Sequence, residues 1–209
     1  EKFKIAPASK IHVIPLGFDL SKFLNVTDID RKTIRNEFNI PDDRVLIVIT
    51  GRLTAIKNHS FLLEALSKCK LNTGINVTTL IVGDGELKKD LMHYCNRLGL
   101  TYTEKANISG NSDIIFASWR KDIAKINAAA DIGVLCSLNE GTPVSIIEAM
   151  ATGKPILASR VGGVEDFVED GINGMLSSLD INEYASKLHY LITNPSLRDQ
   201  LGSAGRQSV

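Results

Sequence analysis

Short apolar runs alternate along the whole chain with segments whose apolar residues recur at helical spacing. The runs lack the strict apolar–polar alternation of half-exposed strands, which is typical of strands buried on both faces of a parallel sheet. Strands are predicted at residues 11–15, 45–50, 77–82, 114–117, 132–136 and 155–158. Helices are predicted after Asn58 and over residues 86–98, 121–130 and 182–192.

This alternation predicts an α/β fold, a doubly wound parallel sheet with helices on both faces joined by right-handed crossovers. The chain has 209 residues, which is enough for one such domain and short for two. Ligands of such sheets bind at the carboxyl ends of the strands. A ligand is therefore expected at one or more of the strand-to-helix loops 51–58, 83–86, 118–122, 137–142 and 159–163.

The charge balance and the cysteines exclude several classes of protein. Lys plus Arg and Asp plus Glu both number 24, so no net field gathers polyanions and we expect no nucleic-acid partner. The cysteines Cys69, Cys95 and Cys136 are widely spaced, which favours neither a zinc site nor a disulfide framework. No apolar run reaches the roughly 18 residues of a spanning helix. We expect a cytoplasmic location, with peripheral association at the inner face of the membrane left open.

A polar stripe interrupts the apolar helix that follows the strand at 132–136. Thr142 and Pro143 suit its N-cap and first position. Thr142, Ser145, Glu148 and Thr152 then recur three and four residues apart on one face. Burying an unpaired carboxylate is costly, so Glu148 should have a dedicated partner. Two interpretations stay open. The helix N-terminus and the polar stripe could face an anionic, hydroxyl-rich ligand, or the helix could lie at the surface with its polar face exposed to solvent.

The loop after the strand at 45–50 carries Gly51, Arg52 and Lys57. Glycine lets the backbone approach a ligand, arginine offers a planar fork for phosphate oxygens, and lysine adds a compact charge. Together these residues would neutralise a diphosphate without a metal. A turn with two solvated cations is the alternative.

Two motifs make the chain recognisable. Residues 140–156 read Glu-Gly-Thr-Pro-Val-Ser-Ile-Ile-Glu-Ala-Met-Ala-Thr-Gly-Lys-Pro-Ile, with Glu140 and Glu148 eight residues apart. This segment resembles the paired-glutamate motif of the group 1, or family 4, retaining glycosyltransferases with the GT-B fold. Gly-Arg-Leu at 51–53 followed by Lys-Asn at 57–58 resembles that family's other recurrent motif. The fold implied is Rossmann-like, one half of a GT-B fold.

The resemblance assigns roles to the glutamate segment. Glu148 would hold the ribose hydroxyls of a nucleotide sugar, and Glu140 a hydroxyl of the transferred sugar. Backbone amides around Gly141 and Thr142 would approach the sugar and diphosphate, and we expect Ser145 to share this site. The family often has an aromatic residue and a glycine at 142 and 143, and Pro143 has no N–H to donate. The sugar specificity therefore stays open.

The resemblance also implies a catalytic set of Arg52, Lys57 and Glu140. Arg52 and Lys57 would contact the leaving diphosphate and stabilise the charge that grows there as the anomeric bond breaks. The reaction would retain anomeric configuration, and neither paired glutamate is assigned as a nucleophile. No cofactor is expected beyond the nucleotide-sugar substrate, and no metal.

Two further loops are predicted to border the nucleotide. Gly83 lies in a Gly-Asp-Gly turn that resembles the family's glycine turn and lacks the third glycine of a dinucleotide loop, which disfavours a dehydrogenase. Arg120 lies in the loop that skirts the base in the family. The favoured alternative for that loop is a structural turn with Trp119 packed inward.

The resemblance covers nearly the whole chain, beginning at residues 13–19. It implies that residues 1–209 form the C-terminal donor-binding domain, with the N-terminal acceptor domain absent, so that this fragment alone is inactive or slow. The enzyme would transfer a sugar, expected to be UDP-linked, to a saccharide or lipid-linked acceptor in cell-envelope or capsular polysaccharide synthesis. The alternatives are a nucleotide-sugar binding module without catalysis and a GT-B-fold epimerase.

Overall fold

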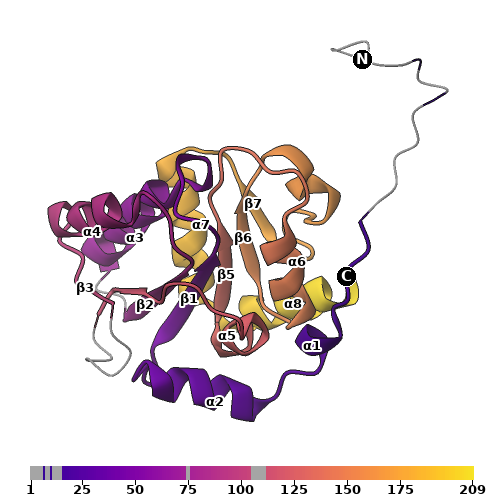
Figure 1. The fold of residues 1–209 in the computed structure, drawn as a ribbon, viewed down its shortest axis with the longest axis horizontal. Helices are drawn as coiled ribbons and strands as arrows, with labels where there is room; N and C mark the ends of the chain where they lie inside the picture. The colour runs from indigo at the N-terminus through magenta and orange to yellow at the C-terminus, as the bar shows by residue number, and fades with distance from the viewer. Residues whose placement is uncertain (1–6, 8–9, 11–15, 74–75, 105–111) are drawn as a thin grey trace.

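The computed structural model describes residues 7, 10, 16–73, 76–104 and 112–209. Within these ranges, one parallel sheet has the strand order β3-β4-β2-β1-β5-β6-β7 (Figure 1). The strands are β1 (Val45–Thr50), β2 (Val77–Val82), β3 (Tyr102–Thr103), β4 (Ile114–Phe116), β5 (Ile132–Leu135), β6 (Ile156–Ser159) and β7 (Met175–Ser177).

The strand order reverses between β1 and β5, and β4 is inserted between β2 and the edge strand β3. From β1 the sheet grows outward through β2 and β4 to β3, and the chain then returns to pair β5 with the free side of β1. Strands β6 and β7 extend the sheet from there. This is the doubly wound parallel sheet predicted from the sequence, and its topological switch point lies at the carboxyl ends of β1 and β5.

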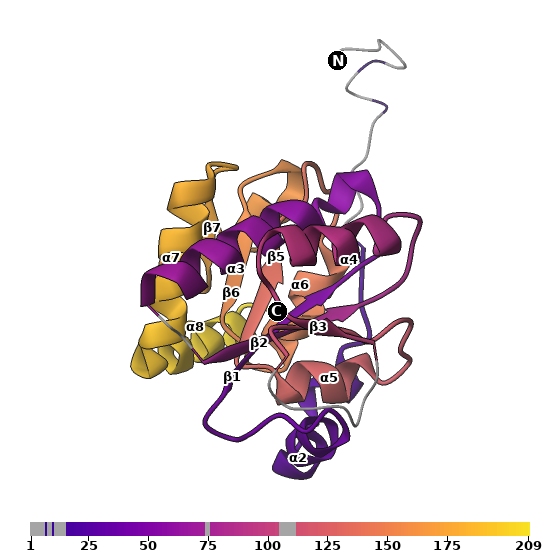
Figure 2. The same ribbon diagram turned by 90° about the vertical axis from the view of Figure 1, so that its left-hand side faces the viewer.

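Helices cover both faces of the sheet. They are α1 (Ser21–Leu24), α2 (Asp28–Glu37), α3 (His59–Thr73), α4 (Lys88–Arg97), α5 (Ile123–Ala129), α6 (Val144–Ala151), α7 (Ile181–Thr193) and α8 (Pro195–Gln207), with the short 3-10 helices η2 (Ala55–Lys57) and η3 (Gly162–Asp166). Figure 2 shows α3 and α4 on one side of the sheet and α2 and α5 on the other. Helix α8 packs against α6, α7 and β6.

Burial on both faces explains the apolar runs. In β1, Ile47 and Ile49 pack with α3 and α7, whereas Leu46 and Val48 pack with α2 and α5. All four side chains are buried, because successive side chains of a strand point to opposite faces and here both faces are covered. The expectation of strands without polar alternation is confirmed.

The differences from the predicted elements include two short edge strands and helix α8. Strands β3 and β7 were missed because runs of two and three residues carry little pattern. Helix α8 was missed because its glycines look like helix breakers, yet a Cβ at Gly202 would lie 2.2 Å from the Gly153 carbonyl oxygen. Glycine is therefore what permits this helix to pack. The predicted strand at 11–15 lies outside the described residues.

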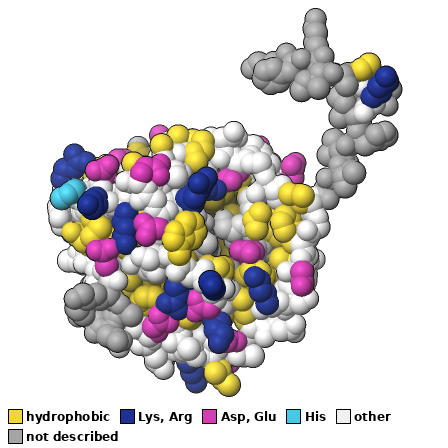
Figure 3. Space-filling model, in the orientation of Figure 1, with side chains coloured by type: hydrophobic (Ala, Val, Ile, Leu, Met, Phe, Trp, Pro, Cys, Tyr) yellow, Lys and Arg dark blue, Asp and Glu magenta, His cyan; other side chains and the backbone are white. Residues whose placement is uncertain are grey.

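No helix in the described ranges is both long enough and apolar enough to cross a bilayer. On the face drawn in Figure 3, basic and acidic side chains are interspersed.

Candidate functional site

The loops that follow β1 and β5 lie side by side at the switch point. The backbone N–H of Leu138 donates to the Ile56 carbonyl at 2.8 Å. The Cys136 thiol donates to the Lys57 carbonyl at 3.3 Å. The two loops in which the sequence predicted a diphosphate site and a sugar site therefore form one structural unit.

Lys57 and Glu140 form an ion pair across these two loops. The Lys57 Nζ lies 2.6 Å from Glu140 Oε1. The Ser137 hydroxyl donates to the same oxygen at 2.6 Å. The sequence did not predict this contact, although Ser137 lies in one of the loops where a ligand was expected. The Glu140 side chain is 10% exposed, and no hydrogen bond to its Oε2 is found among the described residues. This second oxygen can still accept from a ligand hydroxyl.

Arg52 is exposed on the same loop as Lys57. Within the described part of the chain, its guanidinium has neither an ion pair nor a hydrogen bond. Beside it, a Cβ placed on Gly51 would lie 3.7 Å from Cδ and Cε of Lys57, so the Lys57 stem runs over Gly51. The loop thus presents the Arg52 guanidinium, which has no partner in the described ranges, next to the Lys57 ammonium, which Glu140 already neutralises.

Glycines allow the neighbouring loops to pack closely against the loops that carry Lys57 and Glu140. Gly83 has φ of +140°, and a Cβ there would lie 2.0 Å from the Gly51 carbonyl oxygen. The backbone N–H of Gly163 donates to the Glu140 carbonyl at 3.1 Å, and a Cβ on Gly163 would lie 2.0 Å from the Gly141 carbonyl oxygen. Glycine is required at both positions so that one loop can pack on the next. That Gly83 also borders a nucleotide stays a prediction.

Helix α6 begins one residue later than the sequence suggested. Pro143 is the N-cap, with ψ of 71° and without a side-chain capping bond, so the prediction of Thr142 as N-cap is wrong. The ring fixes φ but leaves ψ free, and a non-helical ψ places Pro143 before the first turn. The Val144 N–H donates to the Thr142 carbonyl at 2.9 Å. For the N–H groups of Gly141, Thr142 and Ser145, no acceptor is found among the described residues, which leaves three donors at the start of α6.

Glu148 follows on the same helix and is partly buried. Desolvation raises the pKa of its carboxyl, and the positive charge of Lys22 opposes this shift. The dedicated partner that burial demands is not found among the described side chains, so the carboxylate is available to a ligand. Thr152 does not extend the stripe, because its buried hydroxyl donates to the Ala149 carbonyl at 2.7 Å.

The loop after β4 departs from expectation. Trp119 is 64% exposed, so the prediction that it packs inward is wrong. Arg120 donates from Nε to Asp122 at 2.9 Å and from Nη2 to Glu37 at 2.9 Å. These bonds to Asp122 and Glu37 raise the pKa of Arg120. Its guanidinium already has two carboxylate partners, and its contact with a nucleotide base stays a prediction.

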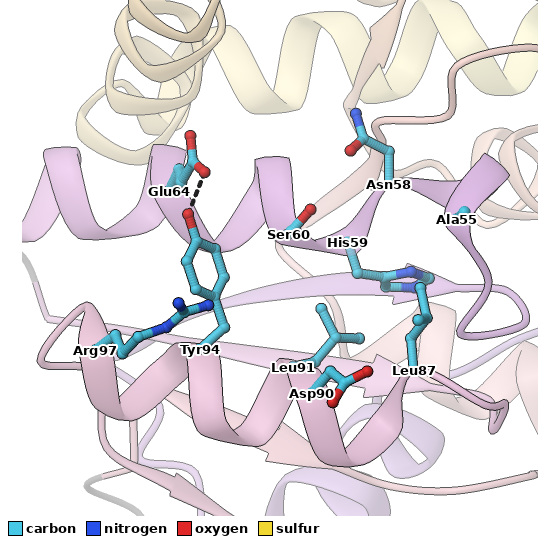
Figure 4. Close-up of a pocket in the computed structure, with 10 residues that line it drawn as sticks. All are labelled: Ala55, Asn58, His59, Ser60, Glu64, Leu87, Asp90, Leu91, Tyr94 and Arg97. Carbon is cyan, nitrogen blue, oxygen red and sulfur yellow. Dashed lines mark hydrogen bonds between the residues drawn. The ribbon is translucent and has the colours of Figure 1, made fainter.

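A separate groove of about 330 Å³ lies between α3 and α4, and none of the predicted site residues lines it (Figure 4). Tyr94 of α4 donates its hydroxyl to Glu64 of α3 there. The ring of His59 is buried beside Lys57, and desolvation followed by that positive charge lowers its pKa to about 4. His59 is therefore neutral at physiological pH.

No cluster of three or more His, Cys, Asp or Glu residues in the described ranges could hold a metal ion. Metal independence of the site nonetheless stays a prediction.

Comparisons with known proteins converge on one family. The family model described as Glycosyl transferases group 1 matches residues 30–208. The UDP-Gal:alpha-D-GlcNAc-diphosphoundecaprenol alpha-1,3-galactosyltransferase of Escherichia coli is 34% identical over 187 residues, which cover 86% of this chain and 44% of that protein. The chain spans about half the length of the curated relatives it matches.

Solved structures share the fold. The crystal structure of Anabaena Alr3699/HepE in complex with UDP and glucose has a TM-score of 0.83 and 26% identity, covering 97% of this chain and 53% of the other. The C-terminal domain of a glycosyl transferase group 1 family protein (LpcC) from Francisella tularensis has a TM-score of 0.76 at 24% identity. It covers 92% of this chain and 96% of that one, and the likeness is one of fold.

Proposed function

Because the chain belongs to the group 1 family of glycosyl transferases, we propose that it is the donor-binding domain of an enzyme that uses a nucleoside diphosphate sugar. The transfer retains configuration at the anomeric carbon. The observation that carries this proposal is the meeting of Lys57 and Glu140 at the switch point, 2.6 Å apart, beside the start of α6. Ligands of doubly wound sheets bind at this place.

The diphosphate is bound by Arg52, by Lys57 and by the N–H groups that precede and begin α6, for which the described residues offer no acceptor. Backbone amides at a helix N-terminus favour an anion, and Arg52 has no protein partner among the described residues to give up first. Arg52 and Lys57 then stabilise the charge that develops on the leaving diphosphate as the anomeric bond breaks. In this assignment both cations contact the leaving group directly.

The two glutamates bind hydroxyls. Glu148 accepts from the ribose, which supplies the partner that its partly buried carboxylate lacks among the described residues. Glu140 accepts from the transferred sugar, through Oε2 at first and through both oxygens once the diphosphate draws Lys57 away. Lys57 thereby connects the leaving group to the sugar subsite.

UDP is the proposed nucleotide. The Escherichia coli relative is named for a UDP-linked galactose, and the Anabaena protein was crystallised with UDP, with UDP and glucose, and with UDP-glucose. The name of the first relative includes a diphosphoundecaprenol-linked saccharide, which supports a lipid-linked acceptor and a role in cell-envelope polysaccharide synthesis. Such an acceptor also favours a cytoplasmic enzyme at the inner face of the membrane. We place acceptor binding in the part of the protein that corresponds to the other half of these relatives.

Calorimetric titration of this chain with UDP, ADP and GDP, each with and without Mg²⁺, tests the proposal. Saturable binding of UDP in preference to the purine nucleotides, at the same affinity with and without the metal, is expected. Absence of binding by all three nucleotides would refute a donor site. Preference for ADP or GDP would refute the choice of UDP as the nucleotide but would leave the donor site in place.

A further inference from the structure

Two polar side-chain atoms beneath the site are buried and have no hydrogen-bond partner in the part of the chain that the structure describes. Oγ1 of Thr50, the last residue of β1, and Nδ2 of Asn127, on α5, are inaccessible to solvent and have no hydrogen-bond partner among the described residues. Leaving such a group unsatisfied costs about 1–3 kcal/mol. Two of them close together call for a specific explanation.

Both residues line one small cavity that Ser145 of α6 also lines. Its volume is about 10 Å³, counted as the space open to the centre of a water molecule. About 10–15 Å³ measured in this way is the lower limit for holding one water, and a buried water typically makes about three hydrogen bonds. Thr50, Asn127 and Ser145 supply three polar groups from three different elements.

We propose that this cavity is a binding site for one structural water molecule, and that Thr50, Asn127 and Ser145 are positioning residues for the donor site. The water accepts from the Asn127 amide and donates to the hydroxyls of Thr50 and Ser145. These bonds tie the first turn of α6 to the end of β1 and to α5. The water satisfies the two buried groups at the same time.

The position of the water-binding cavity links it to the donor site. Thr50 directly precedes Gly51 and Arg52, and Ser145 lies in the first turn of α6, where its backbone N–H is unpaired among the described residues. The water therefore sets the spacing between the cationic loop and the helix amides that we assign to the same diphosphate. Ser145 acts through its side chain on the position of α6, in place of a side-chain contact with the ligand.

The test compares three substitutions. Thr50→Val removes the hydroxyl and keeps the shape, and Thr50→Ser keeps the hydroxyl. Thr79→Val is the matched control, because Thr79 Oγ1 on β2 is also buried without a partner among the described residues but does not line this cavity. A high-resolution crystal structure of the wild type and of each variant locates the water. Calorimetry measures the UDP affinity of the same proteins.

We expect one water, bonded to all three residues, in the wild type, in Thr50→Ser and in Thr79→Val, and its loss in Thr50→Val. UDP affinity should fall about three- to tenfold in Thr50→Val, the worth of a typical hydrogen bond, and be restored in Thr50→Ser. Electron density without a water in the wild-type cavity overturns the water site. Equal UDP affinity for Thr50→Val and Thr79→Val overturns the positioning role.

The positioning role rests on the proposed function, and the water site does not. If the wild type fails to bind UDP, the proposed function and the positioning role fall together, while the crystal structures still decide whether the water is present.

Discussion

Lys57 Nζ lies 2.6 Å from Glu140 Oε1, so the side chain that we assign to the diphosphate and the side chain that we assign to the sugar form an ion pair across the switch point. A diphosphate that binds Lys57 has to compete with this carboxylate. Once it does, Glu140 keeps the hydrogen bond from Ser137 and gains the freedom to accept a sugar hydroxyl. The ion pair therefore couples binding of the diphosphate at Lys57 to binding of the sugar at Glu140.

Glu140→Gln should tighten the binding of UDP by a few fold, because the diphosphate no longer competes with a carboxylate for Lys57. The same substitution should reduce the advantage of UDP-glucose over UDP, since the sugar loses a carboxylate acceptor. Calorimetry with both ligands measures this. Glu169→Gln, at an exposed position, controls for the change in net charge. Weaker UDP binding in Glu140→Gln would contradict the competition.

Arg52→Ala should lower UDP affinity by about 10–100-fold, the worth of a charge-assisted hydrogen bond of about 1.5–3 kcal/mol. The folded protein should keep its stability, because the exposed Arg52 has no partner to lose in the described ranges. Fluorescence titration and thermal unfolding measure the two effects. Arg97→Ala, which removes another exposed arginine, should leave the affinity unchanged. An equal loss in both variants would show a general charge effect.

Glu148→Gln should raise the melting temperature while it weakens UDP binding. Burial raises the pKa of this carboxyl, which means that the charged form is destabilised by folding, and the neutral amide avoids that cost. The melting temperature of Glu148→Gln should therefore exceed that of the wild type in the absence of UDP. Differential scanning calorimetry with and without UDP separates stability from affinity. A variant that is less stable but binds UDP normally would assign Glu148 to the fold alone.

The two glutamates show which features of the site the sequence could predict and which it could not. Spacing placed Ser145 and Glu148 on one helix face, and alternation placed the loops of Lys57 and Glu140 at the same edge of one sheet. Neither pattern revealed that Lys57 and Glu140 touch. These two residues are 83 positions apart in the sequence. Whether they touch depends on the conformations of the two loops, which are set by tertiary packing.

UDP affinity should fall as the pH is lowered, with a midpoint above the ordinary glutamate pKa of 4.5, because Glu148 protonates early and then no longer accepts from the ribose hydroxyls. The sign follows from the raised pKa: the carboxylate form, which binds, is fully present only well above it. Calorimetry across the acid range gives the profile. Protonation of the UDP phosphate affects every variant alike, so the ratio of wild-type to Glu148→Gln affinity isolates Glu148. A ratio independent of pH would refute the assignment.

Gly163→Ala should destabilise the site loops by about 1–3 kcal/mol, the usual cost of forcing an atom into packed space. The added Cβ would lie 2.0 Å from the Gly141 carbonyl oxygen and push apart the loops of η3 and α6. Thermal unfolding and UDP titration should both show a loss. Gly17→Ala is the control, since no atom lies within 4 Å of a Cβ there. Unchanged stability and affinity in Gly163→Ala would show that the loops separate freely.

Three features of the site loops were not visible in the sequence patterns. Pro143 looked like the first residue of α6, but its fixed φ says nothing of its ψ, which is not helical. Trp119 was expected to pack inward, whereas tertiary packing leaves it 64% exposed. The partner of Arg120 was not foreseen either: Glu37 from a distant helix binds it, while its contact with a nucleotide base stays a prediction. The exposure of Trp119 and the partner of Arg120 depend on contacts between elements, and the place of Pro143 depends on its ψ. Residue spacing along the chain shows neither.

A crystal structure of this chain with UDP tests the donor-site assignment most directly. We predict diphosphate oxygens within hydrogen-bond distance of Arg52 and Lys57, ribose hydroxyls on the Glu148 carboxylate, and Glu140 separated from Lys57. UDP bound elsewhere, for instance in the groove between α3 and α4, with the Lys57–Glu140 ion pair intact, would contradict this account.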